Sequence, residues 1–255
     1  MRDDSETHPP VPAPAPIWSD EFDGTSLDDS KWVTGFAWCP VATCTSTTTP
    51  KMAYLDTQVS ESGGLLRLRA DNVPVTVSGR TYPYRSGMVT TSAYYGEGGP
   101  RAYRRLFTPP VRIEWRMRSP KGHGFWPALW LLPPEGVWPP EIDIVEVLGH
   151  DTFRAHHHYH WRDVQGALHD QGTSMLNATD LAADFHEYRV DWTAAAITWY
   201  VDGIQRFEYA GPGITTTPMY LVANFHVGGA SPGDPDASTI WPAYMDLDWV
   251  RVYGI

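Results

Sequence analysis

EIDIVE, residues 141–146, is a short segment in which acidic and apolar residues alternate. On a β-strand alternate side chains share one face, so Glu141 and Asp143 point to one side and the isoleucines point into the core. Strict alternation would also send Glu146 into the core, where an unpaired carboxylate is costly. One extra residue, a β-bulge near Ile144-Val145, returns Glu146 to the face of Glu141. The segment therefore predicts a bulged strand with three carboxyl groups in a row.

Three carboxyl groups this close cannot all ionise freely, so at least one pKa rises. Glycoside hydrolysis needs such a division of roles, because one carboxylate attacks the anomeric carbon while a carboxylic acid protonates the leaving oxygen. In retaining enzymes the two groups are about 5–5.5 Å apart. The alternative is an ordinary solvated strand face. The flanking segments GFWPALWLLP at 124–133 and Trp138-Pro139-Pro140 favour a site, since solvated faces do not usually collect tryptophan.

Strand patterns recur along the rest of the chain, while helix signals are poor. Clusters of Gly, Pro and Asn or Asp separate the strands, and Asp202-Gly203 supplies the turn of a hairpin at 200–207. Strands are predicted at 65–70, 87–95, 111–119, 141–149, 153–161, 186–193, 197–203, 219–227 and 245–253. We therefore predict an all-β fold, a jelly-roll β-sandwich of two antiparallel sheets.

The charge balance excludes several classes of partner. The chain has 19 basic and 30 acidic residues, a net charge of −11, which argues against nucleic acid and against an anionic membrane surface. No apolar run approaches the roughly 20 residues of a membrane span. The 12 Trp and 13 Tyr belong either to the core or to a surface on which flat sugar faces lie. A neutral glycan suits this composition.

The organisation predicted from composition is a disordered Pro-rich lead or linker at 1–16 and a single domain at 17–255. Cys39 and Cys44 are the two cysteines, and we expect them to form a disulfide in a secreted protein whose signal sequence has been removed. Two free thiols in a cytosolic protein are the alternative. We expect a monomer, and a zinc site is disfavoured because there is no second cysteine pair.

With this motif and its flanking segments, the sequence resembles glycoside hydrolase family 16, the laminarinase-like enzymes. The family motif is Glu-x-Asp-x-x-Glu with the bulge. The resemblance implies a concave jelly-roll sandwich with a glycan-binding cleft, Glu141 as nucleophile, Glu146 as acid/base, Asp143 as the residue that tunes the nucleophile, and net retention. It covers nearly the whole chain after the lead, through segments in the family's order at 17–32, 119–133, 185–192, 197–203, 224–229 and 245–253.

Aromatic and histidine residues near the motif are candidates for glycan contact. Trp126, Trp130 and Trp138 are expected to form platforms for sugar rings, with core packing as the alternative. Three other tryptophans are expected in the core, namely Trp192, Trp199 and Trp249. On the next strand, alternate histidines share one face; they are His156, His158 and His160. This face has three interpretations. It is either a metal site of cupin type or an ordinary polar surface. The third interpretation comes from the family resemblance, which implies that His160 is a histidine of the glycan-binding cleft.

The family resemblance also implies a structural calcium ion on the convex side. The matching positions are Glu21, Gly63 and Asp248, of which the first two would contribute backbone carbonyls. A plain surface acid is the alternative. No cofactor is expected for catalysis.

Three departures from the family pattern concern the substrate. Met88 follows Ser86-Gly87 where an Arg is usual, Pro140 replaces a Gly, and Gly228-Gly229 runs into ASPGDPD. We expect an endo-acting enzyme on β-1,3-glucan, with mixed-linkage glucan, agar, carrageenan or another galactan as alternatives. Anionic galactans would need basic residues, for which the candidates are Arg85, Arg101, Arg104, Arg105 and Arg154. A non-catalytic glycan-binding module and a cupin-like metalloprotein are the competing classes.

Overall fold

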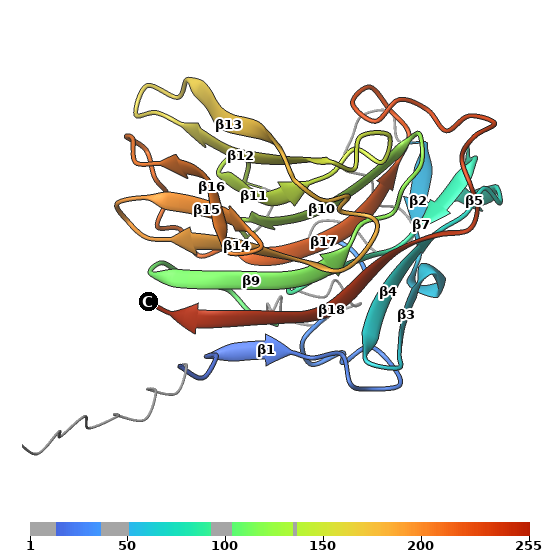
Figure 1. Cartoon of the computed structure of the whole chain (residues 1–255), viewed down its shortest axis with the longest axis horizontal. Helices are drawn as coiled ribbons and strands as arrows, with labels where there is room; N and C mark the ends of the chain where they lie inside the picture. The colour runs from blue at the N-terminus through green and yellow to red at the C-terminus, as the bar shows by residue number, and fades with distance from the viewer. Residues whose placement is uncertain (1–13, 37–50, 93–103, 135–136) are drawn as a thin grey trace, which may run out of the picture.

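Two large antiparallel sheets lie face to face in the computed structural model, which describes residues 14–36, 51–92, 104–134 and 137–255 (Figure 1). Cys39 and Cys44 lie outside the described residues. Apart from one 3-10 turn, η1 (Asp56–Gln58), the regular elements of the described chain are strands. Within these residues no helix has the length and apolar character needed to cross a membrane.

The outer sheet is built around the long strand β18, which is paired along both of its edges. β9 lies along one edge, while β4 and β1 share the other. In spatial order the strands are β16 (Ile204–Tyr209), β15 (Ile197–Val201), β14 (His186–Trp192), β9 (Val111–Arg118), β18 (Ala243–Gly254), β4 (Leu65–Ala70) and β3 (Val59–Ser62), with β1 (Trp18–Asp20) against β18.

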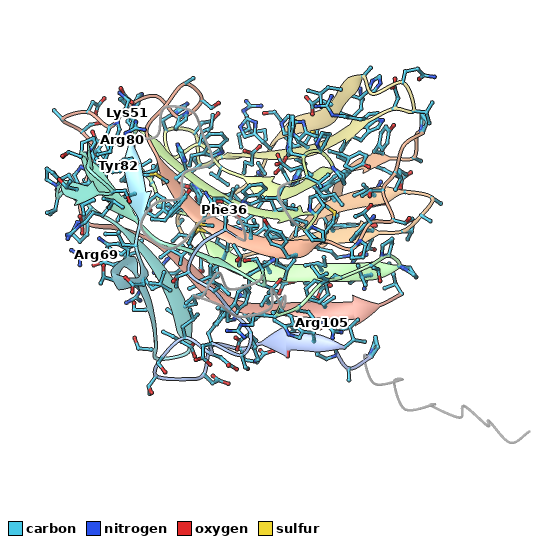
Figure 2. The ribbon with its side chains drawn as sticks, turned by 180° about the vertical axis from the view of Figure 1, so that it is seen from behind. Phe36, Lys51, Arg69, Arg80, Tyr82 and Arg105 are labelled. Carbon is cyan, nitrogen blue, oxygen red and sulfur yellow. The ribbon has the colours of Figure 1, made fainter. Side chains whose placement is uncertain are left out.

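The inner sheet carries the acidic segment near its middle. Its strands, in spatial order, are β13 (Leu168–Leu176), β12 (Arg154–Arg162), β11 (Glu141–Glu146), β10 (Phe125–Leu132), β17 (Tyr220–Val227) and β8 (Met88–Thr90). Two small sheets pair β2 (Met52–Tyr54) with β7 (Tyr84–Ser86) and β5 (Val75–Val77) with β6 (Arg80–Tyr82). Figure 2 shows Lys51, Arg80 and Tyr82 at the end of the molecule that carries these small sheets.

The predicted strands are present, with shorter bounds for some. Within the predicted segment at 87–95 the structure has β8, and residues 93–95 lie outside the described part of the chain. β13 was not predicted because its residues are mostly polar and exposed. The hairpin between β15 and β16 is confirmed, since Asp202 and Gly203 have φ of 51° and 74°. These positive values are what Asp-Gly accommodates in a tight turn.

The core lies between the two sheets and follows from the alternation of the outer strands. In β9 every second residue is buried, from Val111 to Met117. Of the three tryptophans predicted in the core, Trp192 and Trp199 are there at 0% exposure. Trp249, at 9% exposure, is not part of the core cluster, and the guanidinium of Arg251 lies over its ring. At roughly 25 cal/mol per Å² and about 200 Å² per ring, each fully buried tryptophan contributes about 5 kcal/mol of transfer free energy.

The β-bulge predicted in β11 is confirmed by the strand register. Asp143 lies opposite His158 and Glu146 lies opposite His156, so three steps along β11 match two steps along β12. Ile144 is fully buried together with its neighbour Val145, whereas Glu146 returns to the partly exposed side. The bulge therefore shifts the in–out alternation of side chains by one residue within the motif. This shift keeps the Glu146 carboxyl group out of the core, where burying it would be costly.

Two buried side chains bind the backbone carbonyls of the bulge. Trp199 of the outer sheet donates its indole N–H to the carbonyl of Asp143 at 2.8 Å. His157 of β12 donates Nδ1–H to the carbonyl of Ile144 at 2.7 Å. Burial lowers the pKa of His157 to about 4, so the ring is neutral near neutral pH. The bulge is therefore held from the opposite sheet and from the adjacent strand.

Replacing Trp199 with Phe removes this N–H and leaves the carbonyl of Asp143 without its donor. We expect Trp199→Phe to lower the free energy of unfolding by about 1–3 kcal/mol more than Trp115→Phe does. Trp115 is the matched control, because it is also fully buried and its indole N–H has no hydrogen-bond partner among the described residues. Urea denaturation of both variants measures the difference, and equal losses would show that this bond does not hold the bulge.

Candidate functional site

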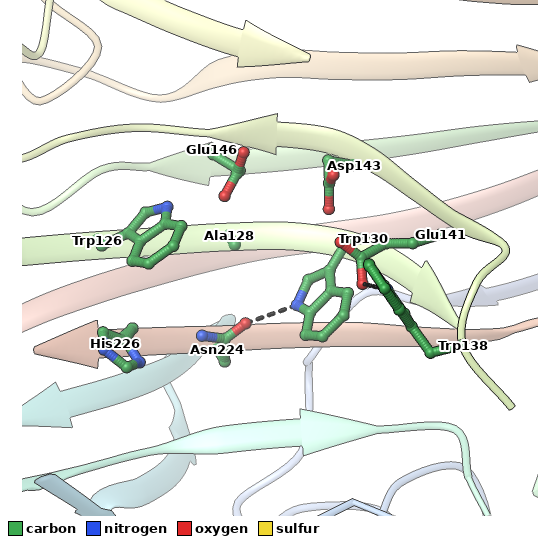
Figure 3. A pocket seen from close by; sticks show the side chains of 9 residues that line it. All are labelled: Trp126, Ala128, Trp130, Trp138, Glu141, Asp143, Glu146, Asn224 and His226. Atoms are coloured by element: carbon green, nitrogen blue, oxygen red, sulfur yellow. Dashed lines mark hydrogen bonds between the residues drawn. The ribbon is translucent and has the colours of Figure 1, made fainter. Parts of the chain in front are cut away.

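A pocket opens over the bulged strand on the inner sheet (Figure 3). It brings together the three carboxyl residues and the three tryptophans that were singled out in the sequence. Its lining residues are Trp126, Ala128, Trp130, Trp138, Glu141, Asp143, Glu146, Asn224 and His226. They come from β10, β11, β17 and the segment before β11, so the floor of the pocket is sheet and one wall is loop.

Glu141 is the carboxyl residue nearest the loop. Its Oε2 accepts a hydrogen bond of 3.0 Å from the indole Nε1 of Trp138, and its Oε1 lies 3.7 Å from Nε2 of His160, the residue opposite it on β12. Burial and the adjacent Asp143 carboxyl raise the pKa of Glu141 well above its ordinary value, while His160 and Trp138 oppose this rise. The side chain is therefore enclosed yet keeps two partners that favour its ionised form.

Asp143 is the most buried of the three carboxyl residues, at 4% exposure. Burial raises its pKa well above the ordinary value, and the carboxyl groups of Glu146 and Asp170 add to the rise. The Glu146 pKa is also raised by burial, although His158 and the indole of Trp126 favour its charged form. At near-neutral pH the pocket can therefore hold both a carboxylate and a carboxylic acid, the pair that general acid–base chemistry requires.

Trp126 and Trp130 form the floor of the pocket, and residues of β17 hold both indole rings in place. Trp130 donates its indole N–H to Oδ1 of Asn224 at 2.6 Å (Figure 3). Asn224 in turn donates from Nδ2 to the hydroxyl of Tyr54 at 2.8 Å. Trp126 meets the ring of His226 edge to face, with 5.3 Å between centroids. Both indoles therefore have a defined orientation along β10.

Asn224 and His226 were not recognised in the sequence as pocket residues. They occupy alternate positions in β17, where every residue is buried, and lie opposite Ala128 and Trp126 of β10. Polar residues at alternate positions of an otherwise apolar strand were the available signal. His226 donates Nε2–H to the carbonyl of Gly228 at 2.9 Å, and burial lowers its pKa to about 4. A neutral ring remains, whose Nδ1 is a hydrogen-bond acceptor.

His160 lies beside the pocket without being one of its lining residues. Its Nε2 is 3.5 Å from Oδ2 of Asp143, and its ring centroid is 6.0 Å from that of Trp138. Asp170 of β13, which no sequence motif marks, has Oδ1 3.4 Å from Nδ1 of His160. His160 therefore lies between the carboxyl groups of β11 and Asp170 on β13, the edge strand of the inner sheet.

The residues predicted to bind calcium have other partners on the outer side of the molecule. The carboxylate of Glu21 pairs with Arg251 at 3.0 and 2.7 Å, and the carboxylate of Asp248 pairs with Arg116. Gly63 lies in the turn between β3 and β4, with φ of 63°.

Four of the five arginines considered for anionic substrates are among the described residues, and none of these four lines the pocket. Arg85 forms a two-pronged pair with Asp71, and Arg154 pairs with Asp151. Neither these two residues nor Arg104 and Arg105 line the pocket, and Arg101 lies outside the described residues.

Comparisons with known proteins agree with the carboxylate-lined β-sandwich. The model of Glycosyl hydrolases family 16 matches residues 57–251, and the chain belongs to this family. It is 30% identical to the laminarinase catalytic domain from Thermotoga maritima MSB8, with a TM-score of 0.78 over 94% of this chain and 98% of that domain. The predicted all-β jelly roll is thereby confirmed.

Two relatives illustrate the range of lengths in the family. The beta-glucanase of Rhodothermus marinus is 30% identical over 93% of this chain and 84% of that protein. The endo-1,3-1,4-beta-glycanase EglC of Rhizobium meliloti (strain 1021) is 29% identical over 93% of this chain and 51% of its own length. The chain thus spans about half the length of several curated relatives that it matches.

Replacing Trp138 with Phe removes the donor to Glu141 and keeps an aromatic ring at a half-exposed position. We expect the pKa of Glu141 to rise by about one unit, because a hydrogen bond to a charged group contributes roughly 1.5 kcal/mol. A ¹³C NMR titration of labelled glutamate side chains measures this shift. In the control, Trp126→Phe, the pKa of Glu146 should rise and that of Glu141 should not; an unchanged Glu141 in Trp138→Phe would contradict the assignment.

Proposed function

We propose that the protein is a retaining, endo-acting glycoside hydrolase that cleaves β-1,3-glucan. The observation that carries the proposal is the pocket itself, in which Glu141 and Glu146 flank Asp143 over a floor of tryptophan. A retaining mechanism needs two neighbouring carboxyl groups, one ionised as the nucleophile and one protonated as the general acid, and burial raises the pKa of Glu146 as the acid requires. Membership of family 16 supports the same reaction class.

In the proposed reaction Glu141 attacks the anomeric carbon while Glu146 gives its proton to the leaving glycosidic oxygen. A covalent glycosyl-enzyme forms, and Glu146 then takes a proton from the water that hydrolyses it. The hydrogen bond from Trp138 and the proximity of His160 favour the ionised form of Glu141 that attack requires. Burial raises the pKa of Asp143 well above its ordinary value, and a protonated Asp143 relieves the repulsion between the two glutamates.

A neutral β-glucan is the proposed substrate because of what lines the pocket. Among the described residues, none of the nine that line the pocket is Arg or Lys, and three are tryptophans on which sugar faces can stack. Sulfated galactans would need cations where this pocket has carboxyl groups. The relatives named beta-glucanase and laminarinase support the same class.

We also propose that the protein is secreted as a monomer with a Cys39–Cys44 disulfide. The calcium ion stays a prediction. Of its three positions, Asp248 would contribute the carboxylate, and an ion there would compete with the guanidinium of Arg116. The proposed reaction uses carboxyl groups alone and needs no cofactor.

The substrate and the stereochemistry can be tested together on a panel of polysaccharides. We expect reducing-sugar release from laminarin and none from agarose or carrageenan, with products that are initially in the β configuration by ¹H NMR. The Glu141→Gln variant should lose about 10⁴-fold in rate, because it lacks the nucleophile. Inverted products would refute the mechanism, and release from agarose alone would refute the substrate.

The pH profile tests the role of Glu146. A general acid must be protonated, and burial raises the pKa of Glu146, so kcat/KM should fall as pH rises through that pKa. With an aryl β-glycoside whose leaving group needs no proton, Glu146→Gln should keep its kcat/KM and lose this basic limb. An unchanged basic limb in Glu146→Gln would assign the acid to another residue.

A further inference from the structure

A second cluster, of histidine and carboxyl side chains, lies beside the pocket. It is on β12 and β13, the two strands at one edge of the inner sheet. Oδ1 of Asp170 lies 3.3 Å from Nδ1 of His158 and 3.4 Å from Nδ1 of His160. One donor atom from each of these three residues lies within 4.8 Å of the other two. His156, the third histidine on the predicted face, is not part of this cluster.

The spacing within the cluster is that of a tetrahedral metal site. Zinc–nitrogen and zinc–oxygen bonds are about 2.0–2.1 Å long, and the edge of a tetrahedron with such bonds is about 3.3–3.4 Å. Both separations from Asp170 have this length. The two histidine nitrogens are within 4.8 Å of each other, and both side chains are partly exposed, so small ring rotations can close the third edge.

The backbone places the three ligands without help from a loop. Asp170 lies directly opposite His160 in the pairing of β12 with β13, and Gly172 lies opposite His158. A Cβ atom at position 172 would collide with Nδ1 of His158, so glycine leaves the room in which this ring lies over β13. The rings of His158 and His160 are nearly parallel, at 8° and 5.8 Å between centroids. Both rings therefore present one edge toward the same strand.

We propose that His158, His160 and Asp170 bind a transition-metal dication, for which Zn²⁺ is the best fit. Two imidazoles and one carboxylate are a donor set that zinc accepts, with a fourth position left for water. The other nitrogen of His160 lies 3.5 Å from Asp143 and 3.7 Å from Glu141. A metal-bound histidine that donates its second N–H to a carboxylate is a common arrangement, because it fixes the ring and strengthens the ligand.

This site connects metal occupancy to the pocket. Zinc on Nδ1 of His160 leaves Nε2–H facing the carboxyl groups of Asp143 and Glu141, at 3.5 and 3.7 Å. Bound zinc therefore changes the rate of hydrolysis, a consequence that rests on the proposed function. Binding itself does not rest on it, since it is measured without substrate.

Isothermal titration calorimetry with Zn²⁺ on the full chain tests the site. The wild-type protein should bind one equivalent at this site, and Asp170→Asn should weaken that binding at least tenfold. Asp170 is half-exposed, so this variant should fold normally. The matched control is His169→Ala, which removes a histidine of the same strand as Asp170. His169 pairs with Asp163 at 2.8 Å and belongs to no group of three possible metal ligands among the described residues. It should leave zinc affinity unchanged.

Three results would overturn the proposal. One is the absence of saturable binding to the wild-type protein at millimolar Zn²⁺, and another is an unchanged affinity in Asp170→Asn. The third is a loss of binding in Asp143→Asn but not in Asp170→Asn, which would place the ion among Glu141, Asp143 and His160 instead. If zinc binds as proposed but no polysaccharide is cleaved, the proposed function fails and the metal site stands.

Discussion

The hydrogen bonds to the bulge in β11 are the constraint on which the rest of the site depends. A bulge interrupts the regular ladder, and its buried carbonyl groups need donors from elsewhere. Trp199 reaches across from the opposite sheet and His157 from the next strand. Packing of the two sheets and placement of the carboxyl groups are thus one problem, because the core tryptophan that fills the sandwich also fixes the backbone beneath Asp143.

The electrostatics of the pocket follow from enclosing three carboxyl groups on one strand face. Burial disfavours every charge there, and each carboxyl group disfavours the charge of its neighbours. Trp138, Trp126 and the histidines of β12 counteract this unevenly along the strand. The three carboxyl groups therefore have different environments: Asp143 is the most enclosed, while Glu141 and Glu146 each have an indole that favours the charged form. Different protonation states along one short strand need no metal or cofactor.

Sequence alone was sufficient for the features that depend on local alternation. The parity of EIDIVE predicted the bulge, and the tryptophans around it predicted the pocket. Asn224 and His226 were missed because they are two polar residues in an otherwise apolar strand, and only the pairing of β17 with β10 shows that their face meets the pocket. Asp170 escaped for a related reason: it acts through the register of β12 against β13, which no local pattern encodes.

The polar strand β13 has a consequence for how the molecule behaves among its own copies. It ends the inner sheet, with β12 as its single neighbouring strand in the part of the chain that the structure describes. A long apolar strand in that position would be a template for pairing with another chain and for aggregation. The exposed polar residues of LHDQGTSML make such pairing unfavourable. The polar composition of β13 gives it no alternating hydrophobic pattern, and the same composition protects the open edge of the sheet.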